Sequence, residues 1–552
     1  DHSVALLMKA PGIAAKAKTL SEDPVEQIAA TLEHLQIPQP QWPEYLQAVL
    51  MRISGWAAWA AYLRWQARLE GKEDNTLTDL LAVRLSWQQL IDDGERHQGS
   101  VWHRWQEQWQ EHMTSAPAQT EDAAEAAPTD VLSDKPLTRI WQRAHEISYQ
   151  SLLSKRLQQN PLAQASQVSV QAVFCIDVRS EVFRRHLEAQ SDEIQTLGFA
   201  GFFGLPISYT PLGTEATRPQ LPGLLAPALN ITDSCGNAVQ DHKIRQQRQS
   251  ALNRLLSWQP FKSVPASAFT LVETLGINYA GKLIRRSLSD QSDLKTGNNL
   301  GLKKQSAHKL QPSFTHSGAD LNQQTELAKK VLTGMGLIAN GAREKLAPLV
   351  LLVGHGSQSH NNPQRAGLDC GACCGQTGEV NSRALANLLN DETVRKALSD
   401  DGVEIPATTH FVAALHNTTT EEISLFDEAL IPESHRSAVN KLQHQLTTAG
   451  KKARQERAPS LALSELQDQP EKLLKAVKQR ANDWAQTRPE WGLSNNASFI
   501  IAPRFKTRGI PLDGRSFLHD YSPQKDPEGE LLEQIMTAPM IVTHWINMQY
   551  FA

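Results

Sequence analysis

The pattern of hydrophobic and polar positions divides the chain into a helical first part and a later part with mixed helix and strand character. Residues 1–113 carry apolar positions at helical spacing. Residues 114–136 are rich in Ala, Pro, Asp and Glu and show no periodicity, which is typical of a linker or a surface insertion. We therefore expect a helical N-terminal region at 1–113, a linker or insertion at 114–136, and an α/β domain with insertions at 137–552.

The helical first part is unusually rich in tryptophan, with eight of the thirteen tryptophans of the chain. Trp56, Trp59 and Leu63 lie at helical spacing, so they fall on one face of the helix. Large apolar side chains on one helix face usually pack against another helix. We therefore expect Trp56 and Trp59 to belong to a helix–helix core.

Apolar runs rich in β-branched residues mark the expected strands of the later part. The run at 347–353 is uninterrupted, which is typical of a strand that is covered on both faces. Other expected strands lie at 168–174, 194–200, 411–415 and 498–501, and a helix is expected at 181–190. Together they predict an α/β fold with a mostly parallel sheet flanked by helices, and large helical insertions between 210 and 345.

Three chemically active side chains follow the first of these strands. Cys175, Asp177 and Arg179 occupy alternate positions, so they share one face if the strand continues through them. Burying this trio without a further partner would be costly. A metal ion bound by Cys175 would explain it, with Asp177 reaching either the metal or the guanidinium of Arg179. The alternative is a simple Asp–Arg pair at a polar strand end.

A second cluster of candidate ligands follows the 347–353 run. His355 stands between two glycines, and Cys370 follows it by fifteen positions. In open parallel sheets, ligands bind beyond the carboxyl ends of the strands. Cys175, Asp177, His355 and Cys370 therefore predict one zinc site. If Asp177 turned to Arg179, the fourth position would open to water, whose pKa zinc lowers from ~15.7 towards ~7.

The remaining cysteines and histidines leave alternatives open. Cys373 and Cys374, together with Cys370 and either Cys175 or Cys235, would suggest an iron–sulfur cluster, which would leave His355 and Asp177 without a role. We favour Cys373 and Cys374 as small apolar groups packed near the site. His360 and His416 are either proton relays or ordinary solvated and core histidines.

Composition excludes several classes of function. The net charge is −4 with both signs interspersed, so nothing indicates nucleic-acid binding. No apolar run approaches the ~18 residues of a spanning helix, so membrane contact would need a partner or a surface patch. The five cysteines are too few and too clustered for a disulfide framework. Because the sequence starts at Asp1 and stops after the apolar segment 539–552, we expect a piece of a longer chain.

The Cys-x-Asp-x-Arg motif with a later His and Cys resembles the zinc site of β-type carbonic anhydrases. In that family two cysteines and a histidine bind zinc, and the Asp–Arg pair gates the fourth position. The resemblance maps the ligands to Cys175, His355 and Cys370, and the catalytic gate to Asp177 and Arg179. It implies a β-carbonic-anhydrase-like sheet. One departure is that His355 and Cys370 are much further apart here than in those enzymes.

Longer stretches resemble the DabA family of bacterial inorganic-carbon accumulation subunits. They lie at 173–181, 198–204, 354–357, 367–373, 483–492 and 546–550. The resemblance implies Zn²⁺ bound by Cys175, Asp177, His355 and Cys370. It also implies energy-coupled, one-way hydration of CO2 to bicarbonate by a peripheral protein at the cytoplasmic face of the bacterial inner membrane.

The implied partner is a proton-conducting membrane subunit of the DabB type, which resembles the antiporter-like subunits of respiratory complex I. Two alternatives remain at this stage. One is a zinc-stabilised scaffold that only docks on a membrane subunit. The other is a stand-alone zinc hydrolase or carbonic anhydrase.

Overall fold

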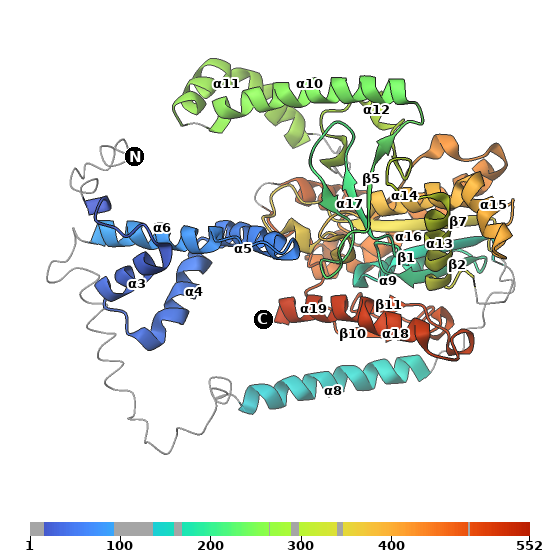
Figure 1. Cartoon of the computed structure of the whole chain (residues 1–552). Coiled ribbons are helices and arrows are strands. Elements are labelled where there is room, and N and C mark those ends of the chain that lie inside the picture. Colours follow the sequence, from blue (N-terminus) through green and yellow to red (C-terminus); the bar gives the residue numbers. More distant parts are fainter. Residues whose placement is uncertain are drawn as a thin grey trace. The chain divides into compact units, whose positions relative to one another are not determined.

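A computed structural model describes residues 16–92, 136–158, 168–263, 265–288, 297–338, 346–483 and 486–551 (Figure 1). The chain divides into two compact units, Asp1–Trp141 and Gln142–Ala552.

The first unit is helical in its described part, as the sequence predicts. Its helices are α3 (Pro24–His34), α4 (Trp42–Arg52), α5 (Ser54–Leu69) and α6 (Thr76–Asp92), followed by the start of α8 (Pro136–Gln158). Asp23 caps α3 by accepting from the backbone N–H groups of Val25 and Glu26. Leu32, Leu35 and Leu85 are buried in small apolar clusters between the helices.

The expected core role of Trp56 and Trp59 is wrong. These side chains are 71% and 56% exposed, whereas Ala60 is the buried residue of α5. The ring of Trp59 instead packs on Tyr62, with centroids 5.5 Å apart, and Tyr62 packs on Trp65. Helical spacing identified a shared face correctly, but it does not determine whether that face is covered.

The second unit contains the strands and the remaining helices. The strands are β1 (Val170–Cys175), β2 (Ile194–Phe199), β3 (Ile207–Thr210), β4 (Arg218–Pro219), β5 (Leu229–Ser234), β6 (Gln311–Ser313), β7 (Leu349–Gly356), β8 (His410–Asn417), β9 (Glu422–Leu425), β10 (Ser498–Ile501) and β11 (Ser516–His519). The helices after α8 are α9 (Val178–Glu188), α10 (Ala238–Ser263), α11 (Pro265–Leu288), α12 (Lys304–Ala307), α13 (Leu321–Gly334), α14 (Glu379–Asn390), α15 (Glu392–Asp400), α16 (Glu433–Arg457), α17 (Pro470–Asn482), α18 (Glu530–Thr537) and α19 (Pro539–Phe551).

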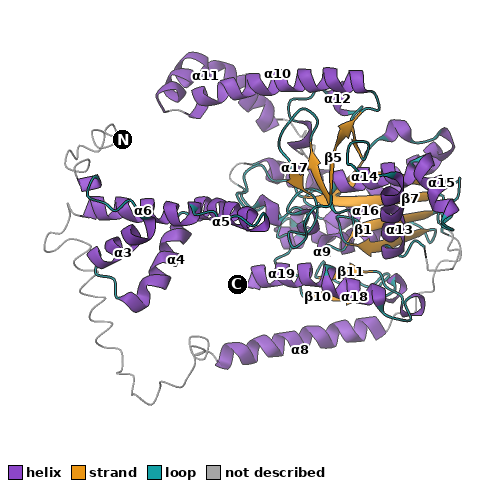
Figure 2. Cartoon of the chain, viewed as in Figure 1, coloured by secondary structure: helices purple, strands orange, loops and turns teal. Residues whose placement is uncertain are grey.

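The central sheet has the order β2-β1-β7-β8-β9. The first four strands are parallel, and β9 is antiparallel to β8. One face packs on α13 and α14 through residues such as Val331 and Leu385, and the other packs on α9 and α16 through Phe183 and Leu446. The expected α/β class with a mostly parallel sheet is therefore confirmed, with the sheet strands lying among helices (Figure 2).

The short strands β3 to β6 form a separate four-stranded sheet in the order β4-β3-β5-β6, and β10 pairs with β11. The sequence did not predict the four-stranded sheet, because its strands are short and carry polar residues such as Asn230 and Asp233. The expected helical insertions in this region are present as α10 and α11.

The strand order reverses between β1 and β7. The chain leaves β1 through α9 to reach β2 on one side, and it leaves β7 through α14 and α15 to reach β8 on the other. Gly354 at the end of β7 meets the start of α14 so closely that a Cβ would lie 2.5 Å from the Gly378 carbonyl oxygen. Such a reversal point in a parallel sheet is a usual place for a ligand.

Candidate metal centre

Three of the four residues expected to bind metal meet at this reversal point. Cys175 is the last residue of β1, His355 lies near the end of β7, and Cys370 precedes a short 3-10 turn. One potential ligand atom from each lies within 4.8 Å of the other two, and all three residues are buried. Two distant parts of the chain thus bring two sulfur atoms and one imidazole together.

The loop after β7 brings Cys370 back to the site, and the carboxylate of Asp369 joins the two ends of this loop. The backbone N–H of Ser357 donates to Oδ1 of Asp369 at 2.8 Å. The N–H of Cys370 donates to the carbonyl of Gln376 at 3.0 Å, which fixes the start of the turn. These bonds explain how two ligands that are fifteen positions apart in the sequence become neighbours in space.

The strand argument for Asp177 and Arg179 is wrong in its geometry. β1 ends at Cys175, and helix α9 begins at Val178 rather than at Glu181, so Arg179 is helical. Asp177 is the N-cap, and it accepts from the backbone N–H of Arg179 at 2.9 Å. The two side chains still pair because the guanidinium folds back on the cap, with Nε to Oδ1 and Nη2 to Oδ2 both 2.8 Å.

Asp177 lies beside the three clustered ligands but is turned towards Arg179. Its Oδ2 is 3.6 Å from Nε2 of His355. Burial favours the protonated acid, but the charges of Arg179 and His355 oppose it and hold the pKa of Asp177 well below its usual range. Asp177 is therefore an anion at neutral pH, close to the site and held by one guanidinium.

The two thiols of the group would stay protonated without a cation. Hydrogen bonding with Cys370 and burial raise the pKa of the Cys175 thiol well above its usual value. A bound metal ion reverses this tendency, because a coordinating thiol is deprotonated. The donor set of two sulfurs and one imidazole suits zinc, and three protein ligands are typical of a catalytic rather than a structural zinc site.

The space beside the sulfurs also fits a metal ion. A Cβ on Gly201 would lie 2.6 Å from Sγ of Cys370 and 2.7 Å from Sγ of Cys175. Nδ1 of His355 is buried, and the described residues provide it with no hydrogen-bond partner. Only glycine at 201 leaves both sulfur atoms unobstructed on this side.

A small cavity of about 30 Å³ opens on the group. Apart from Cys175, Asp177 and His355, its lining is largely apolar and includes Ala200, Phe202, Phe517, Val542 and Ile546. The volume is enough for about one or two molecules of the size of water. The site can therefore hold a small molecule against a mostly apolar wall.

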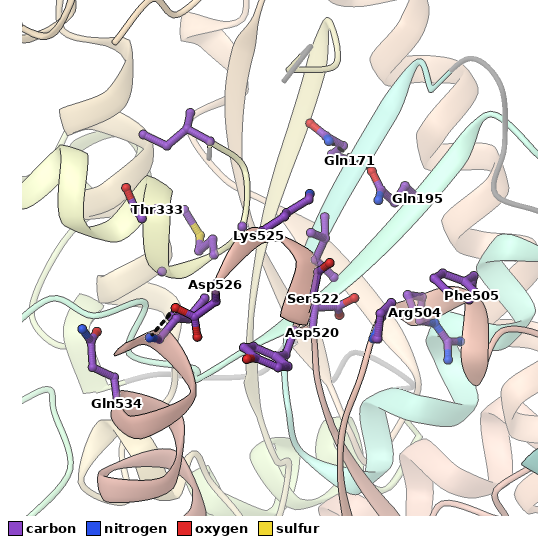
Figure 3. A pocket seen from close by; sticks show the side chains of 18 of the residues that line it. Gln171, Gln195, Thr333, Arg504, Phe505, Asp520, Ser522, Lys525, Asp526 and Gln534 are labelled. Carbon is purple, nitrogen blue, oxygen red and sulfur yellow. Dashed lines mark hydrogen bonds between the residues drawn. The ribbon is translucent and has the colours of Figure 1, made fainter. Parts of the chain in front are cut away.

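A larger cavity of about 690 Å³ lies elsewhere in the same unit (Figure 3). Gln171 and Gln195 line it from β1 and β2, and Lys525 and Asp526 line it from the segment before α18. None of the clustered cysteine and histidine ligands lines this cavity. The chemistry of the donor set therefore selects the smaller cavity as the candidate site.

The other cysteines lie outside the Cys175–His355–Cys370 group. Cys373 is buried nearby, and its Sγ donates to the carbonyl oxygen of Gly201 at 3.3 Å. Cys235 lies between β5 and α10, next to Asn237. Among the described residues, the group of potential metal ligands contains two cysteines and one histidine, which does not favour an iron–sulfur cluster.

The two further histidines differ in their surroundings. His360 is exposed. His416 is buried, and its Nε2 lies 2.7 Å from Oε2 of Glu421. His416 pairs in register with His355 on the neighbouring strand, so it lies near the site without joining the ligand group.

Sequence reasoning missed two charged residues close to the Asp177–Arg179 pair. Glu490 is buried and accepts from Nη1 of Arg179 at 3.0 Å, and Arg457 donates to the other oxygen of Glu490 at 3.0 Å. Glu490 belongs to the stretch Arg488–Gly492, which stood out in the sequence without an assigned role. Charge pairing between segments so far apart leaves no local pattern.

No helix in the described ranges combines the length and the apolar character needed to cross a membrane.

Comparisons with known proteins give a consistent result. A family model described as "Probable inorganic carbon transporter subunit DabA" matches residues 1–552. Curated proteins of that description are 54% identical over 563 residues in Vibrio cholerae serotype O1 (strain M66-2), 47% over 556 in Paracidovorax citrulli and 44% over 552 in Ectopseudomonas mendocina. Each alignment covers 100% of this chain but only 63%, 64% and 65% of the relative, respectively. No solved structure matches the chain.

Proposed function

The chain belongs to the DabA family, and from this premise we propose that it is the zinc-binding subunit of an energy-coupled inorganic carbon transporter that hydrates CO2 to bicarbonate. The observation that carries the proposal is the buried group of Cys175, His355 and Cys370 beside an apolar cavity. The relatives are named as inorganic carbon transporter subunits, which supports the choice of substrate.

The proposed roles follow from the contacts of each residue. Cys175, His355 and Cys370 would hold zinc, and Asp177 would be a fourth ligand that alternates between zinc and Arg179. Zinc supplies a Lewis acid that lowers the pKa of water towards ~7. Asp177 and Arg179 would thus form the gate of the site. Their ion pair turns the carboxylate towards the guanidinium, which would leave the fourth position to water.

The cavity lining suits CO2, which is small and carries no net charge. Phe202, Phe517 and Ile546 exclude bulk water from the cavity and offer an apolar wall to the molecule. Bicarbonate is charged and gains no comparable stabilisation from this wall. The lining therefore favours entry of CO2 and departure of the anionic product.

The proposal includes a partner. We place the protein peripherally at the cytoplasmic face of the bacterial inner membrane, bound to a proton-conducting membrane subunit of the DabB type. The word "subunit" in the descriptions of the relatives supports a partner. Coupling of proton movement to the Asp177–Arg179 gate would make hydration one-way.

The test combines zinc analysis with rescue of growth at low CO2 in a bacterium that lacks carbonic anhydrase. The protein expressed together with the membrane partner should restore growth, whereas either subunit alone should not. Asp177→Asn keeps the shape of the side chain and avoids leaving Arg179 as an unpaired buried charge. This variant should keep zinc and lose rescue.

The alternatives predict different results. A zinc-stabilised scaffold would keep rescue in the Asp177→Asn variant. A stand-alone hydrolase or carbonic anhydrase would hydrate CO2 without the partner. Either result would contradict the proposed coupling.

A further inference from the structure

All five N–H groups of the Arg179 guanidinium have acceptors. Nε and one hydrogen of Nη2 bind Asp177, and the other Nη2 hydrogen binds the carbonyl oxygen of Leu368 at 2.8 Å. Nη1 donates to Oγ1 of Thr418 and to Oε1 of Glu490, both at 3.0 Å. Three acceptors other than Asp177 therefore fix the plane of the guanidinium.

Glu490 is the charged member of these three acceptors, and its own position is fixed. Its side chain is fully buried. It accepts from Oγ1 of Thr418 at 2.8 Å and from Nη2 of Arg457 at 3.0 Å. Arg457 also pairs with Glu421, so Glu490 stands between the buried guanidinium of Arg179 and the partly buried guanidinium of Arg457. A buried charge with this number of partners has little freedom to move.

The loop that carries Glu490 packs directly on the site. Gly492 has a φ of +61°, and a Cβ there would overlap the side chain of Leu368, whose carbonyl is the third acceptor for Arg179. Trp491 is 61% exposed, and its Nε1 donates to the carbonyl of Ser460 at 2.7 Å. The loop therefore joins an exposed residue to the buried contacts of Arg179.

We propose that Glu490 is a positioning residue that holds Arg179 against Asp177, and thereby keeps the carboxylate away from the metal and the fourth coordination position free. The inference rests on the proposed function for the presence of the metal. Without Glu490, one N–H of Arg179 loses its acceptor in a buried site. Only the neutral acceptors on Leu368 and Thr418 then orient the guanidinium, and its hold on Asp177 weakens. Oδ2 of Asp177 already lies 3.6 Å from Nε2 of His355, so the carboxylate has only a short distance to move to reach the ligand group.

The experiment replaces zinc by Co²⁺ in the protein and measures thiocyanate binding through the visible absorption spectrum of cobalt. In the starting protein, thiocyanate should enter the free fourth position. In Glu490→Ala, Asp177 should occupy that position, and thiocyanate affinity should fall roughly tenfold or more, the scale expected for loss of a charge-assisted hydrogen bond. Glu490→Gln keeps an acceptor for Arg179 and should fall between the two.

Two controls isolate the cause. Glu188 is as buried as Glu490 and forms a two-point pair with Arg504 at 3.0 and 2.8 Å away from the ligand group, so Glu188→Ala should leave thiocyanate affinity unchanged. Adding Asp177→Asn to Glu490→Ala removes the competing carboxylate and should restore thiocyanate binding.

Three results would overturn the inference. Thiocyanate affinity could be unchanged in Glu490→Ala, or it could fail to return in the double variant. Alternatively, both Glu490 variants could fail to load cobalt while Glu188→Ala loads it, which would make Glu490 a structural residue. None of these readouts requires CO2 hydration, so failure of the proposed function is recognised separately by the growth test.

Discussion

At the scale of single residues, the lack of a side chain at Gly201 leaves space for a metal ion beside the two cysteine sulfurs. Gly201 lies against both cysteine sulfurs, and its φ is not in the left-handed region, so an added methyl group would act through space rather than through backbone strain. Gly201→Ala should reduce zinc affinity roughly tenfold or more, the scale seen when the shell around a metal is disturbed. Zinc content after dialysis against a competing chelator measures it.

The matched control is Gly223→Ala, because nothing lies within 4 Å of a Cβ at that position. It should keep its zinc. Equal zinc retention in the two variants would show that the sulfur atoms at Gly201 are not metal ligands.

A second prediction at this scale concerns pH. Burial lowers the pKa of His519 from 6.5 to about 4. Between these two pH values, His519 is protonated in the unfolded chain but neutral in the folded protein. The free energy of unfolding therefore has its full value above pH 6.5 and decreases as the pH falls towards 4. At pH 5 the loss should be about 2 kcal/mol.

His519→Phe should remove this part of the pH dependence, because the ring lies between Phe199 and Phe499 with centroids 5.7 and 6.4 Å away and a phenyl ring suits that place. Denaturant unfolding at pH 7.5 and pH 5 measures the difference, with His444→Phe at an exposed position as control. An unaltered pH dependence in His519→Phe would disprove the assignment.

Sequence reasoning at this scale predicted that Cys175, His355 and Cys370 would meet, and the structure brings their ligand atoms together. Cys175 and His355 stand near strand ends, whereas Cys370 is reached through a loop. Asp177 and Arg179 were paired for the wrong reason, because two residues after a strand can already belong to the next helix. Glu490 could not be found, since its partners lie 311 and 33 positions away.

At the scale of elements, helix α19 closes the small cavity. Val542 and Ile546 line the cavity from this helix, and a Cβ on Gly371, next to Cys370, would lie 3.2 Å from Cδ1 of Ile546. Ile546→Ala should open the small cavity to solvent on the side covered by α19. In metal-free protein, the buried thiols should then react roughly tenfold faster with a thiol reagent, as expected if truncation weakens the closed state by about 1.4 kcal/mol.

Met548→Ala is the control, because Met548 lies on the same helix and is 57% exposed. It should not change the slow reaction of the buried thiols. Equal acceleration in both variants would mean that α19 opens as a whole rather than covering the site through Ile546.

The strands that are most fully buried were the easiest to predict from the sequence. β7 and β8 are buried along nearly their whole length, and their apolar runs marked them within a few residues. The sheet of β3 to β6 was missed, because its strands have only two to six residues each. The apolar–polar alternation in β3 and in the first part of β5 is too short to stand out from the surrounding loops. The apolar pattern of a sequence therefore identifies long, buried central strands more readily than the short strands of a smaller sheet.

At the scale of the whole molecule, the candidate ligands and their partners all belong to the second compact unit. Cys175, Asp177, His355, Cys370 and Glu490 lie within Gln142–Ala552. We expect a protein that begins at Gln142 to bind the same molar amount of zinc as the full chain. Metal analysis of the two proteins after gel filtration tests this, and zinc found only in the longer one would show that the first unit completes the site.

The chain spans 63–65% of the length of the three curated relatives named above. The ligand group lies entirely within this chain, whereas coupling to proton movement would need the membrane partner as well. The sequence predicted the sheet that carries the group, but not the buried charges behind it.

The most direct test of the account is X-ray absorption at the zinc edge of the purified protein. The account predicts one zinc per chain, with two sulfur neighbours at ~2.3 Å and nitrogen or oxygen neighbours at ~2.0 Å. Sulfur coordination should be reduced in both Cys175→Ser and Cys370→Ser. Absence of zinc, or a coordination sphere unaffected by these substitutions, would contradict it.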